Sequence, residues 1–246
     1  MYIGLERAGE TAQVQLRGDM LAPRLLGAGR DSARVGIIAG EALLLAGDTV
    51  ETEVRVGEGC TLELEDIGGT VAYGGDGAAS RWRVSITVER GARLIWHTMP
   101  FVVADGADVC RTTSIVLGRG AVAMLRETFV LGRTGESGGR LLARTDVELD
   151  GRALYRESLT LDGALPRIGV LGTHRVIDSA MSLGRRRASP PGALQLAGEG
   201  TIVRAMGNAA HLATVESEWA QWVSTPSLGG NTAEQQGAPA TPSLHP

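Results

Sequence analysis

The chain has 246 residues and a formal net charge of −4, and all 24 of its basic residues are arginine. Without lysine the chain cannot use Schiff-base chemistry or a Walker-type phosphate loop, and an acidic balance without a basic face argues against a nucleic-acid partner. Aromatic residues make up 4% of the chain and glycine accounts for 35 residues, so aliphatic side chains must form the core and tight turns must be frequent.

The N-terminal segment and the cysteines indicate the cellular compartment in which the protein works. Residues 1–7 contain no apolar region typical of a secretory signal, and no apolar run reaches the length that crosses a bilayer. Cys60 and Cys110 stand far apart and form no paired motif, so a disulfide framework is not indicated. We therefore expect a cytoplasmic protein with no membrane partner.

A strand–turn–strand pattern recurs three times at a spacing of about 30 residues, which is typical of stacked repeat architectures. Each copy is an alternating strand, a turn closed by glycine and a second alternating strand, so each has one apolar face that it cannot bury alone. The chain is therefore predicted to be all-β, an elongated β-helix-like stack in a single domain over residues 1–224. The copies are residues 54–62, 86–94 and 115–123, and their closing glycines are Gly59, Gly91 and Gly120.

Further strands and a hairpin fit the same class. Residues 82–88 alternate apolar and polar side chains without interruption, which is typical of a half-buried strand. Asp150-Gly151 separates two more strand segments, residues 145–149 and 152–155, and an Asp-Gly pair is a strong signal for a two-residue turn. The sequence therefore predicts a β-hairpin at this point.

Helix is predicted only near the C-terminus, as one or two short elements. Leu212, Val215, Trp219 and Trp222 recur at helical spacing, and Asn208 is a candidate cap, so we expect a helix over residues 208–223. Residues 225–246 contain too few apolar side chains to offset the entropy of ordering and are predicted to be a disordered tail.

The sequence does not complete either of two familiar patterns, a zinc site or a hydrolase nucleophile motif. The four histidines share no ligand spacing with one another or with a cysteine, so no resident zinc site is indicated, although a transient site of scattered carboxylates would escape this test. Residues 135–139 match the Gly-x-Ser-x-Gly string of hydrolases, but they lie between two predicted strands, and the nucleophile elbow needs a strand followed by a helix.

Paired carboxylates leave one enzymatic alternative open. Strand alternation puts Glu51 and Glu53 on one face, and Glu63 and Glu65 on another. A β-solenoid carbohydrate-active enzyme would use such a pair as acid and base. Such enzymes also stack sugars on aromatic rings, which are few here, so solvated strand faces explain the pattern more simply.

Six short segments form a more specific pattern because they stand in a fixed order over most of the chain. The segments are Ala46-Gly47-Asp48, residues 54–62, residues 91–96 with the string Gly-Ala-Arg-Leu-Ile-Trp, residues 100–107, Arg126-Glu127 with residues 131–136, and Asp150-Gly151-Arg152.

This order resembles the urease accessory protein family called UreD, or UreH in some organisms. Residues 64–73 lack the lysine that the family often has, and His97-Thr98 stands where Pro-Gln is usual, which indicates a divergent branch, expected to be actinobacterial. The resemblance implies an all-β protein that is not an enzyme. It also implies a partner, UreF, that recruits the GTPase UreG, and docking of this hetero-oligomer, with a dimer of heterodimers as one candidate assembly, on apo-urease.

The same resemblance implies that nickel passes through the protein in transit, with no tightly bound cofactor. We expect the route to include Asp48, Glu127, Glu136 and Asp162, with Arg133 pairing one of these carboxylates. Trp219 and Trp222 are the expected anchors for UreF, because large aromatic side chains dominate interface energies. The alternative is that both tryptophans only cap the β-stack.

Overall fold

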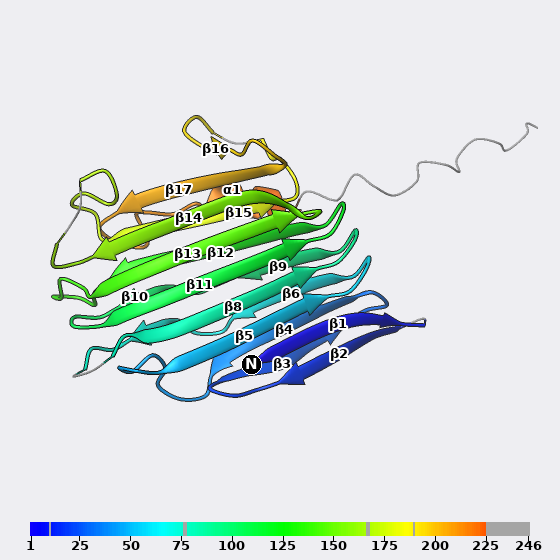
Figure 1. Ribbon diagram of the computed structural model, residues 1–246, viewed down its shortest axis with the longest axis horizontal. Coiled ribbons are helices and arrows are strands. Elements are labelled where there is room, and N and C mark those ends of the chain that lie inside the picture. Colours follow the sequence, from blue (N-terminus) through cyan, green and yellow to red (C-terminus); the bar gives the residue numbers. More distant parts are fainter. Residues whose placement is uncertain (10, 76–77, 166–167, 189, 225–246) are drawn as a thin grey trace, which may run out of the picture.

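The protein is a stack of β-strands in two facing sheets, with one short helix on the outside (Figure 1). The computed structural model describes residues 1–9, 11–75, 78–165, 168–188 and 190–224. Within these ranges there are 17 strands and one α-helix. The predicted all-β class and stacked architecture are therefore confirmed.

Seven strands form sheet A. They are β1 (Tyr2–Ala8), β2 (Thr11–Arg17), β5 (Thr49–Val56), β8 (Ser80–Val88), β11 (Asp108–Leu117), β13 (Arg140–Leu149) and β14 (Arg152–Asp162). Their order across the sheet is β14-β13-β11-β8-β5-β1-β2. The five inner strands run parallel, whereas β2 and β14 are antiparallel hairpin partners that form the two edges.

Ten strands form sheet B. They are β3 (Leu21–Ala28), β4 (Ser32–Ala39), β6 (Thr61–Asp66), β7 (Thr70–Ala72), β9 (Arg93–His97), β10 (Phe101–Val103), β12 (Val122–Leu131), β15 (Val176–Leu183), β16 (Leu194–Gln195) and β17 (Gly200–Gly207). Eight of them follow the order β16-β17-β15-β12-β9-β6-β4-β3. The short strand β10 pairs with β12, and β7 pairs with β10.

The chain passes from sheet A to sheet B once in each turn of the stack, from β5 to β6, from β8 to β9 and from β11 to β12. Thr49 pairs with Arg81 in sheet A, and Thr61 pairs with Arg93 in sheet B. Equivalent residues of successive turns therefore lie side by side, which confirms the repeat read from the sequence.

The tight turns between the sheets depend on glycine. Gly59, Gly91 and Gly120 adopt φ angles of 67°, 65° and 68°, a region that side chains with a Cβ rarely enter. The turns also stack, because the amide of Gly59 donates to the carbonyl of Arg90 at 3.1 Å and that of Gly91 to the carbonyl of Arg119 at 3.0 Å. A glycine in each copy therefore fixes the point where the chain changes sheets.

The predicted hairpin at Asp150-Gly151 is confirmed. Both residues have positive φ, 49° and 74°, as a two-residue turn between twisted strands requires. The hairpin joins β13 to β14, and β14 then ends the sheet.

Two apolar clusters hold the structure together. The main core fills the space between the sheets and contains most of the buried valine, leucine and isoleucine side chains. A smaller outer cluster lies on the far side of sheet B, under helix α1 (Glu216–Ser224). Strand β12 is consequently buried on both faces. The buried members of the outer cluster are Ile95, Met124, Ala180, Val203, Val215, Trp219 and Trp222.

The helix begins eight residues later than the sequence predicted, so the expected start at Asn208 was wrong. The hydroxyl of Thr214 accepts a hydrogen bond from the amide of Glu216 at 3.2 Å and acts as the cap. The preceding segment forms turns, and Leu212, which the helical pattern had included, is 73% exposed. The predicted tail at 225–246 lies outside the described residues.

A search of the described residues finds no helix with the length and apolarity needed to cross a membrane.

Candidate functional site

An ion pair crosses the main core and joins the two sheets. Arg111 of β11 and Glu127 of β12 both point inward, are 4% and 7% exposed, and form a hydrogen-bonded salt bridge. Breaking such a buried pair by removing one partner typically costs about 3–5 kcal/mol, because the other charge is left uncompensated. Of the four predicted route residues, Glu127 is the one that is buried.

Aromatic rings surround the guanidinium of Arg111. Its central carbon lies 4.7 Å from the ring centre of Trp82, 5.7 Å from that of Phe129 and 6.0 Å from that of Phe101. The negative face of an aromatic ring attracts a cation by about 0.5–2 kcal/mol. The rings therefore hold the arginine in place beside Glu127.

A second carboxyl group lies close to the same arginine. Asp66, the last residue of β6, accepts a hydrogen bond from Nε1 of Trp96 at 3.1 Å. Burial raises the pKa of Asp66 to about 6; the Trp96 hydrogen bond and the charge of Arg111 oppose this rise, and Glu127 adds to it. Asp66 also lines a narrow cleft together with Trp82 and Trp96, so solvent can reach this carboxyl group.

We call Asp66, Arg111 and Glu127 the interior cluster. Its composition limits how a metal ion can bind there. Carboxylate oxygens bind a borderline divalent cation weakly enough to release it. A cation approaching Glu127 has to displace or share the guanidinium of Arg111. In the part of the chain that the structure describes, no three His, Cys, Asp or Glu side chains converge closely enough to hold a metal ion. The cluster can contact a passing cation through two carboxylates.

Asp48 and Asp162 lie in turns at one end of the stack. Asp48 immediately precedes β5, and Asp162 ends β14 beside the first residue of β13. Each side chain accepts hydrogen bonds from backbone amides of its own turn, at 2.8 Å for Asp48 and 3.0 Å for Asp162. Both carboxylates therefore stabilise loops, and the structure does not bring them to Glu127.

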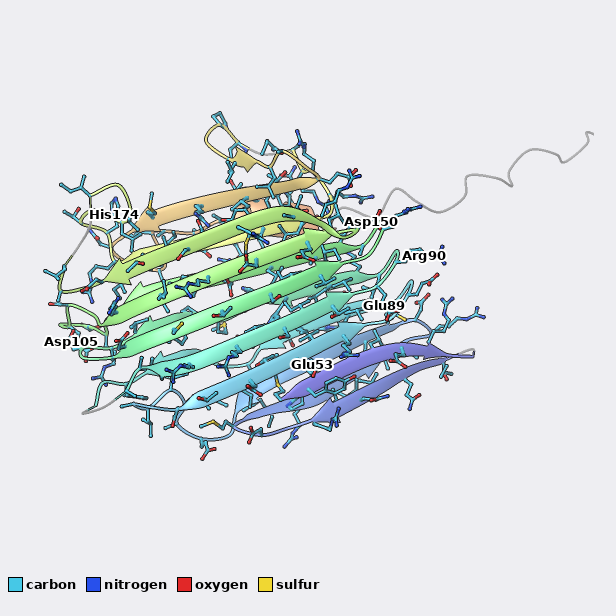
Figure 2. The ribbon with its side chains drawn as sticks, in the orientation of Figure 1. Glu53, Glu89, Arg90, Asp105, Asp150 and His174 are labelled. Atoms are coloured by element: carbon cyan, nitrogen blue, oxygen red, sulfur yellow. The ribbon has the colours of Figure 1, made fainter. Side chains whose placement is uncertain are left out.

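Glu136 lies at the same end and is the partner of Arg133. It forms an ion pair with the Arg133 guanidinium and accepts hydrogen bonds from the amides of Arg133 and Asp105 at 2.8 and 3.3 Å. The hydrogen bond from the Arg133 side chain, with help from these amides, lowers the pKa of Glu136 to about 2. Figure 2 shows Asp105 at this end of the stack and Arg90 at the opposite end, where the glycine turns lie.

A second buried ion pair anchors helix α1 on sheet B. Arg126 of β12 and Asp178 of β15 are 8% and 1% exposed, and Nη2 of Arg126 donates to Oδ2 of Asp178 at 2.9 Å. Arg126 also pairs with Glu216 at the start of the helix. Asp178 in turn accepts the amide hydrogen of Val215 at 3.0 Å. The first turn of the helix is therefore fixed by charges that the sheet buries.

The two predicted partner anchors lie inside the protein. Trp219 and Trp222 are 6% and 2% exposed and pack in the outer cluster. The ring of Trp219 lies 5.8 Å from that of His97, and Nε1 of Trp222 donates to the carbonyl of Ala188 at 3.3 Å. In this arrangement they attach the helix to the sheet, and a part in partner binding stays a prediction.

The sequence did not predict a site role for Asp66 or Arg111, or the pair of Arg126 and Asp178 that anchors the helix. Trp96 and Asp66 are 30 residues apart, as are Trp82 and its hydrogen-bond partner Thr52. This is the spacing of the repeat, so pairing each polar residue with those one repeat away would have found these contacts. No comparable signal exists for Arg126 and Asp178, which meet because β15 returns antiparallel to β12.

Comparisons with known proteins find matches to one family. The model of the family described as UreD urease accessory protein matches residues 21–233. Urease accessory protein UreD 1 of Streptomyces griseus subsp. griseus is 45% identical over 193 residues, which are 76% of this chain and 75% of the relative. Urease accessory protein UreD of Streptomyces coelicolor is 32% identical over 203 residues, 80% of this chain and 79% of the relative.

A third relative, Urease accessory protein UreD of Frankia casuarinae, is 31% identical over 191 residues, 72% of this chain and 60% of the relative. The expected resemblance and its actinobacterial character are confirmed by these matches.

Proposed function

This chain belongs to the UreD urease accessory protein family, and from that premise we propose that it is a non-enzymatic scaffold for inserting nickel into apo-urease. In this proposal it acts in the cytoplasm in a complex with UreF and the GTPase UreG, as a hetero-oligomer for which a dimer of heterodimers is one candidate. Nickel is the cargo of the complex, and this chain holds it only in transit.

The interior cluster is the observation that best supports this proposal. A carboxylate enclosed between two sheets is costly, and a packed aliphatic core would fold without it. Asp66 and Glu127 supply oxygen ligands inside the stack, and the cleft beside Asp66 reaches the surface of the protein. Arg111 balances the charge of Glu127 while no cation is present.

Three other carboxylates are candidates for contact with nickel at the end of the stack, those of Asp48, Glu136 and Asp162. Their carboxylates already accept hydrogen bonds from the backbone, so they would contact a cation through their remaining lone pairs. Arg133 then fixes the position of Glu136 rather than binding the cargo.

Co-expression of this chain with the urease subunits, UreF and UreG tests the proposal. Omitting the chain should leave urease with little nickel and little activity. Asp48→Ala and Glu127→Gln should lower nickel content while UreF still co-purifies. The matched control is Glu51→Gln on the outer face of sheet A, where the side chain is 71% exposed.

Three outcomes decide the matter. Equal urease nickel with and without this chain would overturn the proposed function. Full activation by both variants would remove Asp48 and Glu127 from the route. Loss of the UreF complex would make the residues structural, and the thermal midpoint of each variant shows whether misfolding is the reason.

The carbohydrate-active alternative gains no support from the paired glutamates. Glu51 pairs with Arg83, and Glu53 with Arg55. Glu63 and Glu65 share Arg34. A retaining or inverting glycosidase places its two carboxyl groups around the scissile bond, whereas these four glutamates are exposed on the strand faces and face arginine.

A further inference from the structure

The outer face of sheet B is covered by helix α1 over only part of its width. The helix packs on β9, β12, β15 and β17 through the outer cluster, whereas β3, β4 and β6 lie beyond it. Leu26, Ile38 and Ile67 are 48%, 42% and 52% exposed in this second region. An aliphatic surface therefore lies beside the helix.

Two of these side chains converge over a glycine. A Cβ built on Gly36 of β4 would lie 3.0 Å from Cδ1 of Ile67 and 3.3 Å from Cδ1 of Leu26. Val35 and Ile37 on either side of Gly36 point into the main core, so Gly36 faces outward. Leu26 and Ile67 therefore form one continuous apolar surface on the outside of the sheet.

A groove of about 130 Å³ separates this surface from the helix. One wall is the flank of α1 formed by Trp219 and Val223, four residues apart and hence on the same side of the helix. Ile95 and His97 of β9 form the floor. The far wall is formed by Arg34, Glu63, Leu64 and Glu65.

The side chains that line the groove carry one net negative charge, and the guanidinium of Arg93 lies at the end beside Val223, whose carbonyl accepts a hydrogen bond from it at 3.4 Å. Glu63 and Glu65 lie 3.5 and 3.7 Å from the same guanidinium, that of Arg34, so two carboxylates share one cation. His97 does not restore the balance, because burial and the nearby Arg126 lower its pKa and keep the ring neutral at pH 7. The groove therefore favours an occupant that brings a positive charge next to an apolar surface.

We propose that the groove and the adjoining Leu26–Gly36–Ile67 surface bind an amphipathic helix of a partner protein, with an apolar stripe bordered by arginine or lysine. The groove lies over the face of the sheet at β6 and β9, where the strands pair on both sides, so a helix in a groove is the mode that fits. A second helix here would extend the layer that α1 has begun.

The part of the chain that the structure describes offers no helix of this kind. Its one helix is α1, whose apolar side is already buried and whose last turn carries no basic residue. The described residues of a second copy therefore do not match the groove. The inference rests on the proposed function, because the helical protein UreF that this function requires is the probe for the test.

The experiment measures the affinity of the full chain for UreF by titration calorimetry or biolayer interferometry. Ile67→Arg should weaken binding at least about tenfold, which is about 1.4 kcal/mol, by placing a like charge and a polar group against the basic-bordered stripe. Glu65→Arg should also weaken it, more strongly at low salt. Both side chains are accessible, so neither change disturbs the core.

The matched control is Val116→Arg. Val116 is 44% exposed on the outer face of sheet A, and the substitution is identical, so UreF affinity should stay unchanged. Parental affinity in both groove variants would overturn this inference alone. A parental chain that does not bind UreF at all would overturn the proposed function, and the inference with it.

Discussion

Sheets A and B come from the same repeat, but their outer faces treat charge in different ways. The outer face of sheet A is a solvated surface on which glutamate and arginine pair across neighbouring strands, as Glu51 does with Arg83, at side-chain exposures of 71% and 58%. Figure 2 shows Glu53 on this face. Sheet B instead buries charge on both sides, with Glu127 facing the core and Arg126 facing the helix.

The contrast shows that the repeat by itself does not determine which charged residues affect the stability of the fold. An exposed ion pair contributes about 0–1 kcal/mol, because water screens it and side-chain entropy opposes it. A buried charge must be paired or it destabilises the protein. On its outer face, sheet B buries Arg126 and Asp178 because α1, which follows the repeats in the chain, packs over them.

The largest expected effect comes from weakening the packing of helix α1 on sheet B. Trp222 is 2% exposed and belongs to the outer cluster, so Trp222→Ala should lower the free energy of unfolding by about 3–5 kcal/mol, the range for large buried aromatic residues. Urea unfolding followed by circular dichroism measures this loss. A loss below about 1 kcal/mol would show that the helix contributes little to holding sheet B.

The same variants address the predicted role of the tryptophans in UreF binding. Trp219→Ala and Trp222→Ala can be assayed for UreF affinity at a temperature where both are still folded. Unchanged affinity with reduced stability would leave the tryptophans with a packing role only. Weaker affinity in a folded variant would support a part in the interface.

The next effect in size concerns Asp66 on the inner side of sheet B. Its pKa of about 6 in the folded protein exceeds the ordinary value of 3.8, so the native state binds a proton more tightly than the unfolded chain. The stability that the protonated carboxyl group contributes is present below about pH 4 and is lost as pH rises through about 6. Asp66→Asn should remove this dependence and be more stable at pH 7, by at most about 3 kcal/mol.

Urea unfolding at pH 5 and pH 7 tests this directly, since the parent and variant should converge as pH falls. Asparagine still offers an oxygen to Nε1 of Trp96, so the hydrogen bond is preserved. Glu148→Gln on the exposed outer face of sheet A is the control and should leave the pH profile unchanged. A parallel profile for parent and Asp66→Asn would show that Asp66 is not the titrating group.

The sequence predicted the parts of this fold that are specified locally. Gly59, Gly91 and Gly120 mark tight turns that require positive φ, and Asp150-Gly151 marks a hairpin for the same reason. Features fixed by long-range contact were not predicted. The start of α1 depends on Asp178, which is 37 residues away from the amide it binds.

The candidate site was predicted only in part, for a physical reason. A carboxylate in or beside a predicted strand has the same sequence signature whether it caps a turn, like Asp48, or enters the core, like Glu127. The two cases differ in whether the fold brings an arginine opposite the carboxylate. Glu127 meets Arg111 across the sheets, 16 residues away in sequence, and this separation corresponds to half a turn of the stack.

The smallest expected effect concerns the exposed ion pair of Glu51 and Arg83 on sheet A, which can be compared with the buried pair on sheet B. In a double-mutant cycle of Glu51→Ala and Arg83→Ala, the coupling energy should stay below about 0.5 kcal/mol and fall as salt is added. The equivalent cycle of Asp178→Ala and Arg126→Ala on sheet B should give a larger, salt-insensitive coupling, because its side chains are 1% and 9% exposed and lie out of reach of screening ions. Equal couplings on the two sheets would mean that burial under α1 does not strengthen the pair. The helix anchor would then act through the hydrogen bond that the amide of Val215 donates to Asp178 and not through charge.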